Sequence, residues 1–257
     1  MTTVRVARWA GRDARKDALR ARIWARLEET GTGIGPVWSR IPDFVGARAA
    51  AERVADLPRW KAARTVKCNP DAPQRWVRER ALAEGKLVFT PVPELVREFP
   101  YLKLDPDRLS GAGVPFEVAA TAEGAMAHGE RIGFEDAPFL EIYVVGSVAV
   151  AANGGRTGKG AGFADLEWGV FSALGRVGPD TLVLTTVHEV QIVEAQELAL
   201  EAHDLPLDLI VTPERVIPTR GDRPRPGGVD WARIRPDQFR DISLLSALRT
   251  RLEGARG

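Results

Sequence analysis

The sequence predicts an α/β domain in which a sheet carries helices on both faces. Three stretches are almost wholly apolar, at 142–150, 182–187 and 207–211, as is typical of strands covered on both sides. Stretches with apolar residues at helical spacing alternate with them along the chain. This alternation is the pattern of an α/β fold. The 257 residues are enough for one large domain or two small ones.

The first expected helix covers residues 13–30. Leu19, Ile23 and Leu27 recur four residues apart and mark its core-facing side. Gly31 is suited to end this helix because glycine readily adopts a positive φ. The alternating glycines that continue to Gly35 are followed by a proline, and together they indicate a loop.

Shorter elements are expected in the next part of the chain. Proline can open a helix in its first turn and glycine can end one, and both signals occur here. Residues 97–118 hold several prolines and glycines, which predicts a long loop. The other expected elements are a helix at 46–57, a strand at 64–68, a helix from Pro73 to Gly85 and a strand at 86–90.

Beyond the first apolar run, helices are expected at about 163–174 and 194–203. The composition shifts near residue 219 to a proline- and glycine-rich stretch, which predicts a linker over 219–235. Residues 236–257 carry Ile242, Leu245, Leu248 and Leu252 at helical spacing. We therefore expect a domain at 13–218, a linker and a C-terminal helix that packs on the domain or forms a homo-oligomer contact.

Composition narrows the functional classes. The net charge is +1, so nothing global favours a nucleic-acid partner. The single cysteine, Cys68, excludes an internal disulfide and is expected in the core. The N-terminal residues lack the apolar segment of a signal peptide, and no apolar stretch is long enough to span a membrane. These features predict a cytoplasmic location.

The most informative stretch is GGRTGKGAGFAD at 154–165. Its glycines alternate around Arg156 and Lys159, after an apolar run and before a helical pattern. Such a loop can aim several backbone N–H groups and a helix N-terminus at one phosphate. The spacing matches neither the dinucleotide fingerprint nor the Walker A loop. A plain chain turn explains the glycines as well, so on these residues alone both interpretations stay open.

Four segments in order carry a resemblance to a known family. They are KDALR at 16–20, the glycine-rich stretch, Gln191 after a strand, and HDLPLD at 203–208. Over about 13–218 the chain resembles the 5-formyltetrahydrofolate cyclo-ligase family, and VGSVAV and GFADLEW are similar to its methenyltetrahydrofolate synthetase domain-containing branch. The resemblance implies a three-layer αβα fold with a mainly parallel sheet, like that of the sugar-phosphate isomerase and CoA-transferase group.

The resemblance also implies a reaction and a site. ATP would phosphorylate the formyl oxygen of 5-formyltetrahydrofolate, and ring closure would give 5,10-methenyltetrahydrofolate. Arg156 and Lys159 would be catalytic, and Asp165 and Asp204 would bind Mg²⁺. Phe89 and Pro91 would lie near the folate. The implied nucleotide-binding residues are Lys16, Arg20, Arg156, Gly158, Lys159, Gly160, Ala161, Gly162 and Phe163.

The residues also support other interpretations. Lys16 and Arg20 alone are typical of a solvated basic face, Asp165 of a helix N-terminus and Asp204 of a turn. At Ala151, Ala164 and Leu166 the chain departs from the family pattern, and the family glutamate at the reactive end of the folate has no clear counterpart near 69–74. A divergent nucleotide-binding paralogue with another heterocyclic substrate, and a non-enzymatic binding or regulatory module, therefore remain alternatives.

Overall fold

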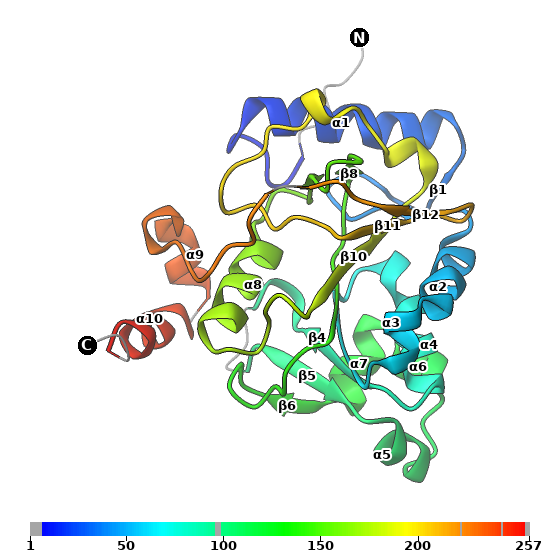
Figure 1. Cartoon of the computed structure of the whole chain (residues 1–257), viewed down its shortest axis with the longest axis vertical. Coiled ribbons are helices and arrows are strands. Elements are labelled where there is room, and N and C mark those ends of the chain that lie inside the picture. Colours follow the sequence, from blue (N-terminus) through cyan, green and yellow to red (C-terminus); the bar gives the residue numbers. More distant parts are fainter. Residues whose placement is uncertain (1–6, 96–98, 222, 243, 255–257) are drawn as a thin grey trace.

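A central eight-stranded sheet organises the computed structural model, which describes residues 7–95, 99–221, 223–242 and 244–254 (Figure 1). Neighbouring strands from β11 to β4 are parallel, and β12, β5 and β6 pair antiparallel at the edges. The prediction of a mainly parallel sheet is confirmed. Across the sheet the strands are β12 (Val216–Pro218), β11 (Leu209–Val211), β10 (Leu182–Thr186), β7 (Ile142–Val144), β3 (Thr65–Cys68), β4 (Leu87–Pro91), β5 (Tyr101–Leu104) and β6 (Glu130–Ile132).

The order of the strands reverses between β3 and β7. From β3 the chain continues to β4 on one side, and from β7 it continues to β10 on the other. Lys67 of β3 lies opposite Tyr143 of β7 in the register of this pair. In open α/β sheets, ligands bind outside the carboxyl ends of the strands at such a reversal.

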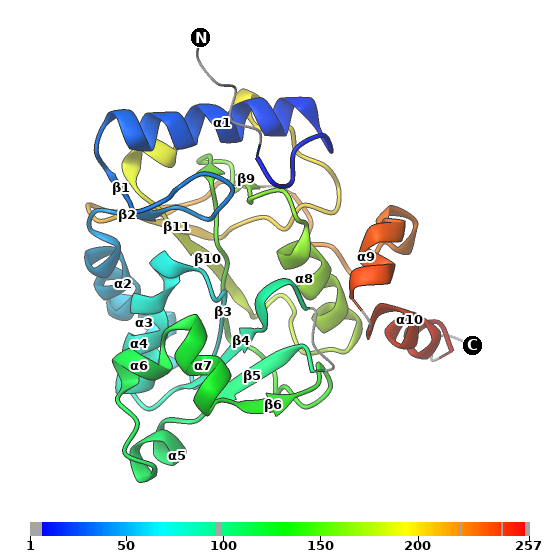
Figure 2. The same ribbon diagram turned by 180° about the vertical axis from the view of Figure 1, so that it is seen from behind.

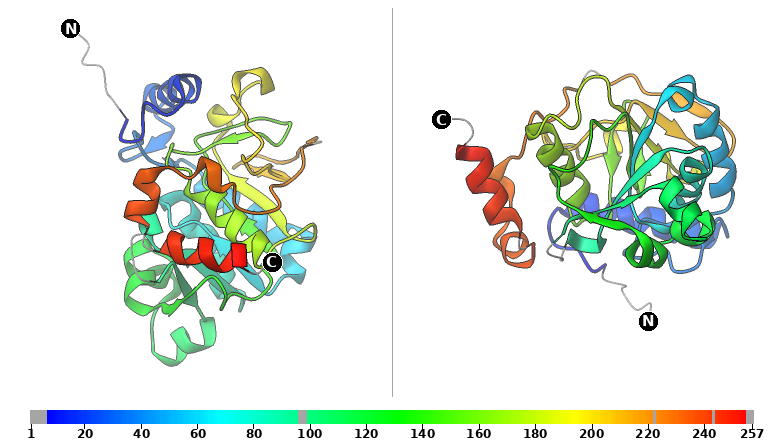
Figure 3. Two further views of the ribbon diagram at one scale, coloured as in Figure 1. Left: turned by 90° about the vertical axis from the view of Figure 1, so that its left-hand side faces the viewer. Right: turned by 90° about the horizontal axis from the view of Figure 1, so that it is seen from below.

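Helices cover both faces of the sheet (Figures 2 and 3). Helix α8 (Phe163–Ala173) lies on one face, and α2 (Ala47–Asp56), α3 (Pro58–Ala62) and α4 (Arg75–Ala83) lie on the other. This is the expected three-layer arrangement. The remaining short elements are β1 (Gly33–Ile34), β2 (Asp43–Phe44), α6 (Phe116–Ala119), α7 (Ala122–His128), and the 3-10 turns η1 (Ala72–Gln74), η2 (Pro93–Leu95), η3 (Glu189–Gln191), η4 (Ala195–Glu197) and η5 (Trp231–Arg233).

Helix α1 (Ala14–Glu29) lies at the end of the sheet where the parallel strands finish (Figure 1). Asp13 caps it by accepting hydrogen bonds from the N–H groups of Arg15 and Lys16, both at 2.9 Å. Its apolar side packs in a second core cluster with the hairpin of β8 (Ala149–Val150) and β9 (Arg156–Thr157). The predicted boundaries of this helix are confirmed. Within the described residues, no helix is long and apolar enough to cross a membrane.

The predicted long loop at 97–118 is wrong for its described residues. These residues include β5, α5 (Pro106–Gly111) and α6. Pro106 occupies the first turn of α5, where it removes no internal hydrogen bond, and Asp105 caps the helix. Pro115 is the N-cap of α6. Pro106 and Pro115 therefore begin helices and do not interrupt them.

The single strand predicted at 142–150 is also wrong, because β7 ends at Val144 and β8 begins at Ala149. Between them, Val145 still donates to Leu184 of β10, whereas Val148 donates to Thr157 of β9. The chain therefore leaves the sheet near Gly146. The two parts form one continuous apolar run in the sequence because both β7 and β8 are buried.

Two helix predictions also need correction. Residues 194–203 form only the turn η4 and an extended stretch, in which Leu198 is buried beside α1. The C-terminal helix is divided into α9 (Pro236–Asp241) and α10 (Leu244–Gly254). The predicted apolar side of this segment is nevertheless buried, and Ile242 and Leu245 join the main core cluster.

Candidate functional site

A cavity of about 640 Å³ opens at the carboxyl ends of β3, β4 and β7. This volume is in the usual range for small-molecule sites. Its walls come from the start of α1, the segments after β3 and β4, the glycine loop with the start of α8, the 201–204 loop and residues 226–238. All predicted nucleotide and metal residues line it: Lys16, Arg20, Arg156, Gly158, Lys159, Gly160, Ala161, Gly162, Phe163, Asp165 and Asp204.

The glycine loop, residues 158–162, needs glycine at two positions. Gly160 has a φ of +108°, and a Cβ there would lie 3.0 Å from Trp9 Cβ. Gly162, with a φ of +77°, is the N-cap of α8. In the described part of the chain, the N–H groups of residues 159–162 have no hydrogen-bond acceptor. The loop therefore offers donors at a helix N-terminus, as an anion site requires.

Two arginines near the start of α1 hold this loop through its carbonyl groups. Arg20 Nε donates to Gly158 O and Arg12 Nη1 donates to Gly160 O, each at 2.7 Å. Arg20 also contacts Asp17 at 2.6 Å. Burial lowers the pKa of Arg20, and the Asp17 carboxylate opposes that shift. The two cations fix the loop and add positive charge beside its free N–H groups.

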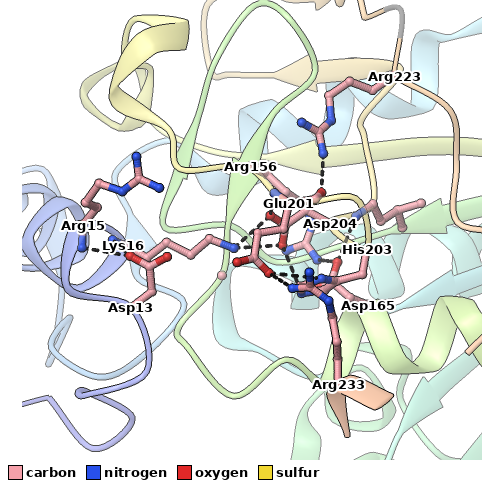
Figure 4. Close-up of polar contacts among 12 residues, drawn as sticks. Asp13, Arg15, Lys16, Arg156, Asp165, Glu201, His203, Asp204, Arg223 and Arg233 are labelled. Atoms are coloured by element: carbon pink, nitrogen blue, oxygen red, sulfur yellow. Dashed lines mark hydrogen bonds and ion pairs between the residues drawn. The ribbon is translucent and has the colours of Figure 1, made fainter. Parts of the chain in front are cut away.

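Three further cations facing the cavity form ion pairs with acids, and Figure 4 shows those of Lys16 and Arg156. Lys16 Nζ reaches Asp204 at 2.8 and 3.0 Å. Arg156 Nη2 lies 2.6 Å from Asp165 Oδ1, and this guanidinium is almost fully buried. Lys159 Nζ lies 3.1 Å from Asp71 Oδ1. A polyanion that binds here can replace these carboxylates as the ion-pair partner of the cations.

One predicted metal-binding aspartate contacts the backbone beside the other. Asp165 Oδ1 accepts a hydrogen bond at 3.0 Å from the N–H of Leu205, the residue after Asp204. Mg²⁺ prefers oxygen ligands and usually keeps several waters and phosphate oxygens, so two carboxylates fit its chemistry. No group of three or more metal-ligating side chains occurs among the described residues. Any Mg²⁺ here would therefore take its remaining ligands from water and from the nucleotide phosphates.

Sequence reasoning missed several residues that line the cavity. Asp71 belongs to the segment in which no family glutamate was recognised, and Glu167 lies two residues after Asp165. The sequence holds a signal for such an acid, because Lys67 is a charged residue within a predicted buried strand and a buried cation needs a partner. The structure supplies Glu167 as that partner. Of the two loosely assigned folate residues, Pro91 lines the cavity, whereas Phe89 belongs to the main core cluster.

Part of the segment predicted as a linker also contributes to this wall. Pro226 O accepts a hydrogen bond of 2.9 Å from Trp168 Nε1 of α8. Arg225 pairs with Asp208 at 2.5 Å. Farther along, Gln238 of α9 reaches the carbonyl of Ala161 in the glycine loop at 3.4 Å. These contacts hold residues 225–238 against the cavity, a role that composition alone did not indicate.

Known proteins are similar to this chain in sequence and in fold. The family model of the 5-formyltetrahydrofolate cyclo-ligase family matches residues 12–213. Methenyltetrahydrofolate synthase domain-containing proteins of Bos taurus and Mus musculus are each 38% identical to the chain, over 93% and 92% of it. The human protein of that name is 35% identical over 93% of the chain. The chain spans about 63% of the length of these relatives.

A solved structure agrees with the sequence matches. The NMR structure of 5,10-methenyltetrahydrofolate synthetase from Aquifex aeolicus has a TM-score of 0.51 and 21% identity, covering 81% of this chain and 95% of that one. At this identity the likeness supports the fold. The family match covers most of the chain and includes both α1 and the glycine loop. The chain belongs to the 5-formyltetrahydrofolate cyclo-ligase family.

Proposed function

We propose that this protein catalyses the ATP-dependent cyclisation of 5-formyltetrahydrofolate to 5,10-methenyltetrahydrofolate. The observation that carries the proposal is the convergence on one cavity of the glycine loop, the cations of α1 and the paired acids. Sequence positions as distant as Lys16 and Asp204 meet there, at 2.8 Å. Family membership supplies the reaction class.

The proposed chemistry needs no protein nucleophile. The formyl oxygen attacks the γ-phosphorus of ATP, and ADP leaves. N10 then attacks the activated formyl carbon, the N10 proton is lost and phosphate departs. Catalysis in such transfers rests on positioning and on stabilisation of charge. The protein's task is therefore to hold the triphosphate and the formyl group together and to keep water out.

Individual residues take parts in this scheme. The N–H groups of the glycine loop and Lys159 receive the β- and γ-phosphates, while Lys16 leaves Asp204 for the triphosphate. Arg156, held by Asp165 and by Gly146 O at 3.4 Å, stabilises charge on the transferred group. Asp165 and Asp204 would hold Mg²⁺ with phosphate oxygens. When bound, this ion neutralises charge on the nucleotide.

An assay of the purified protein tests the proposal. Incubation with ATP, Mg²⁺ and 5-formyltetrahydrofolate should generate the methenyl absorbance with equimolar ADP and phosphate. Lys159→Ala should reduce the rate by about 100-fold or more, the scale of losing one preorganised charged donor. Lys61→Ala should not, because this lysine is exposed and its one ion pair within the described residues is with Asp56, at 3.4 Å. The absence of product over a range of pH and Mg²⁺ concentrations would reject the proposal.

A second candidate function follows from a specific departure in the cavity. The wall has Ala164 and Leu166 where the family pattern has an aromatic residue and an arginine, and Glu167 lies beside them. A paralogue that phosphorylates another heterocyclic substrate fits this wall. ATP binding in calorimetry without folate turnover would support it. Failure to bind millimolar ATP would instead favour a non-enzymatic binding or regulatory module.

A further inference from the structure

A buried cluster beneath the cavity has no part in holding the nucleotide. Lys67 of β3 is fully buried, and its Nζ contacts Glu167 Oε2 at 2.6 Å and Asn69 Oδ1 at 2.7 Å. The same ammonium lies 4.3 Å from the ring centroid of Tyr143. Asn69 and Glu167 both line the cavity. One buried cation therefore holds two polar groups that face the ligand space.

Stability alone does not explain this cluster. Moving two charges out of water costs several kcal/mol for each ion, and well-packed apolar residues often do as well or better. Glu167 is 2% exposed and Lys67 is 0% exposed, so neither gains from solvent. Their position at the reversal between β3 and β7, where α/β folds bind ligands, suggests a functional reason.

The hydrogen-bond chemistry fixes what the two groups can offer. A lysine ammonium can only donate, so the oxygen of the Asn69 amide must face Lys67. The Nδ2 hydrogens of Asn69 are then directed elsewhere and can serve as donors. A carboxylate has about four acceptor positions, and Lys67 occupies part of that capacity on Glu167. The cavity therefore has a neutral donor and a charged acceptor anchored to the same ammonium.

Two tyrosines beside the cluster also have unmatched polar groups. The hydroxyls of Tyr101 and Tyr143 are buried and have no hydrogen-bond partner among the described residues. Burial raises the pKa of both far above its usual value, and the Glu167 charge adds to the shift. Both hydroxyls therefore stay protonated near the carboxylate. Neither tyrosine lines the cavity, and both belong to the main core cluster. They therefore enclose the Lys67–Glu167 pair from the core side, so the groups of the cluster that face the cavity are Asn69 and Glu167.

We propose that Asn69 and Glu167, positioned by Lys67, recognise the 2-amino-4-oxopyrimidine edge of the second substrate. Asn69 donates to the ring carbonyl, and the Glu167 carboxylate accepts from the adjacent ring N–H and the exocyclic amino group. Bidentate pairing with a carboxylate gives both affinity and orientation. The inference rests on the proposed function, in which a folate supplies this edge through its pterin ring. Guanine carries the same edge.

Calorimetry with small heterocycles tests this recognition separately from turnover. The protein is titrated with pterin, with 2-desaminopterin and with guanosine, and then with ATP. Wild type should prefer pterin over its desamino analogue by about tenfold or more, the scale of a hydrogen bond to a charged group. Glu167→Gln should bring that ratio close to one, and its ATP affinity should stay within twofold of wild type.

Glu167→Gln leaves Lys67 without an ion-pair partner, which can prevent folding. A second variant therefore tests the same site. Asn69→Asp keeps an oxygen acceptor for Lys67 but removes the amide donor, so pterin affinity should fall about tenfold. Glu52→Gln is the matched control, since Glu52 is exposed on α2 and pairs with Arg48 at 3.5 Å. Thermal unfolding checks that each variant is folded.

The outcomes separate the two proposals. An unchanged pterin to 2-desaminopterin ratio in Glu167→Gln, together with unchanged pterin affinity in Asn69→Asp, overturns the recognition site even if methenyl product forms. Loss of recognition in the variants without product formation by wild type supports the site and rejects the reaction. Selective binding of guanosine with the same variant effects supports the edge and assigns it to a guanine compound. No binding of either heterocycle by wild type overturns the inference.

Discussion

Lys159 of the glycine loop pairs with Asp71, the N-cap residue of η1 after β3, at 3.1 Å between Nζ and Oδ1. The pair joins the glycine loop to the segment next to Asn69. Under the proposed function, a triphosphate that binds Lys159 must compete with Asp71 for it.

This competition predicts that removing the Asp71 charge strengthens ATP binding. The Lys159 side chain is 30% exposed, so the pair contributes only about 0.2–1 kcal/mol. Asp71→Asn should lower the Kd for ATP by up to about fivefold, measured by calorimetry. In a Lys159→Met background the same change should have no effect, because the pair is already broken. Weaker binding in Asp71→Asn would instead place Asp71 among the groups that hold the nucleotide.

Lys16 should be a main contributor to ATP affinity. It faces the cavity from α1 and is free to leave Asp204 when a phosphate arrives. Lys16→Ala should raise the Kd for ATP by about ten- to a hundredfold, as expected for a charged hydrogen bond. Arg15→Ala is the control, because Arg15 precedes Lys16 on the same helix but does not line the cavity. Equal affinities for the two variants would remove Lys16 from the site.

The glycine loop should tolerate a methyl group at Gly158 but not at Gly160. Gly160 has a φ of +108°, and an added Cβ would lie 3.0 Å from Trp9 and 3.3 Å from Arg20. At Gly158 the nearest atom would be an Arg156 nitrogen at 3.4 Å, an ordinary contact. Gly160→Ala should lower Tm by about 2–8 °C, since positive φ costs about 1–2 kcal/mol before any clash. Similar melting of both variants would show that the loop backbone is not constrained as described.

Asp13 should make the stability of the fold depend on acid pH. Its carboxylate caps α1, and the hydrogen bond from the Lys16 N–H lowers its pKa from 3.8. A lowered pKa means stabilisation that is complete above about pH 4 and disappears as the pH falls through the folded value. Asp13→Ala should cost about 1 kcal/mol at pH 7. Denaturant unfolding should show this difference shrinking below pH 4.

The matched control for that experiment is Asp13→Asn. Asparagine is a good N-cap and does not titrate, so its stability relative to wild type should change little at neutral pH. A wild-type advantage over Asp13→Ala that persisted unchanged to pH 2 would contradict the role of the ionised carboxylate. Such a result would mean that packing around Asp13, and not its charge, holds the start of α1.

Local signals in the sequence were sufficient for much of the fold. The spacing of Leu19, Ile23 and Leu27 predicted α1, and Gly31 lies just beyond its end with a φ of +64°. Cys68 is buried as expected, and burial raises the pKa of its thiol to about 11. These features depend on neighbours within a few residues, so pattern and propensity determine them.

Predictions failed where distant contacts decide the local conformation. The apolar run at 142–150 divides near Gly146 because Val148 pairs with β9 while Val145 pairs with β10. The stretch at 194–203 stays largely extended because Leu198 packs beside α1. Hydrophobicity reports burial, but it does not say which partner buries a residue.

The order of residue types along the chain determined the family, the mainly parallel sheet and the presence of a glycine loop between an apolar run and a helix. Only the tertiary structure decided which charges meet. The partners of Lys16, Lys159 and Lys67 are Asp204, Asp71 and Glu167. Each of these pairs spans at least 88 residues of sequence. Strand order and helix placement set such distances, and no local pattern records them.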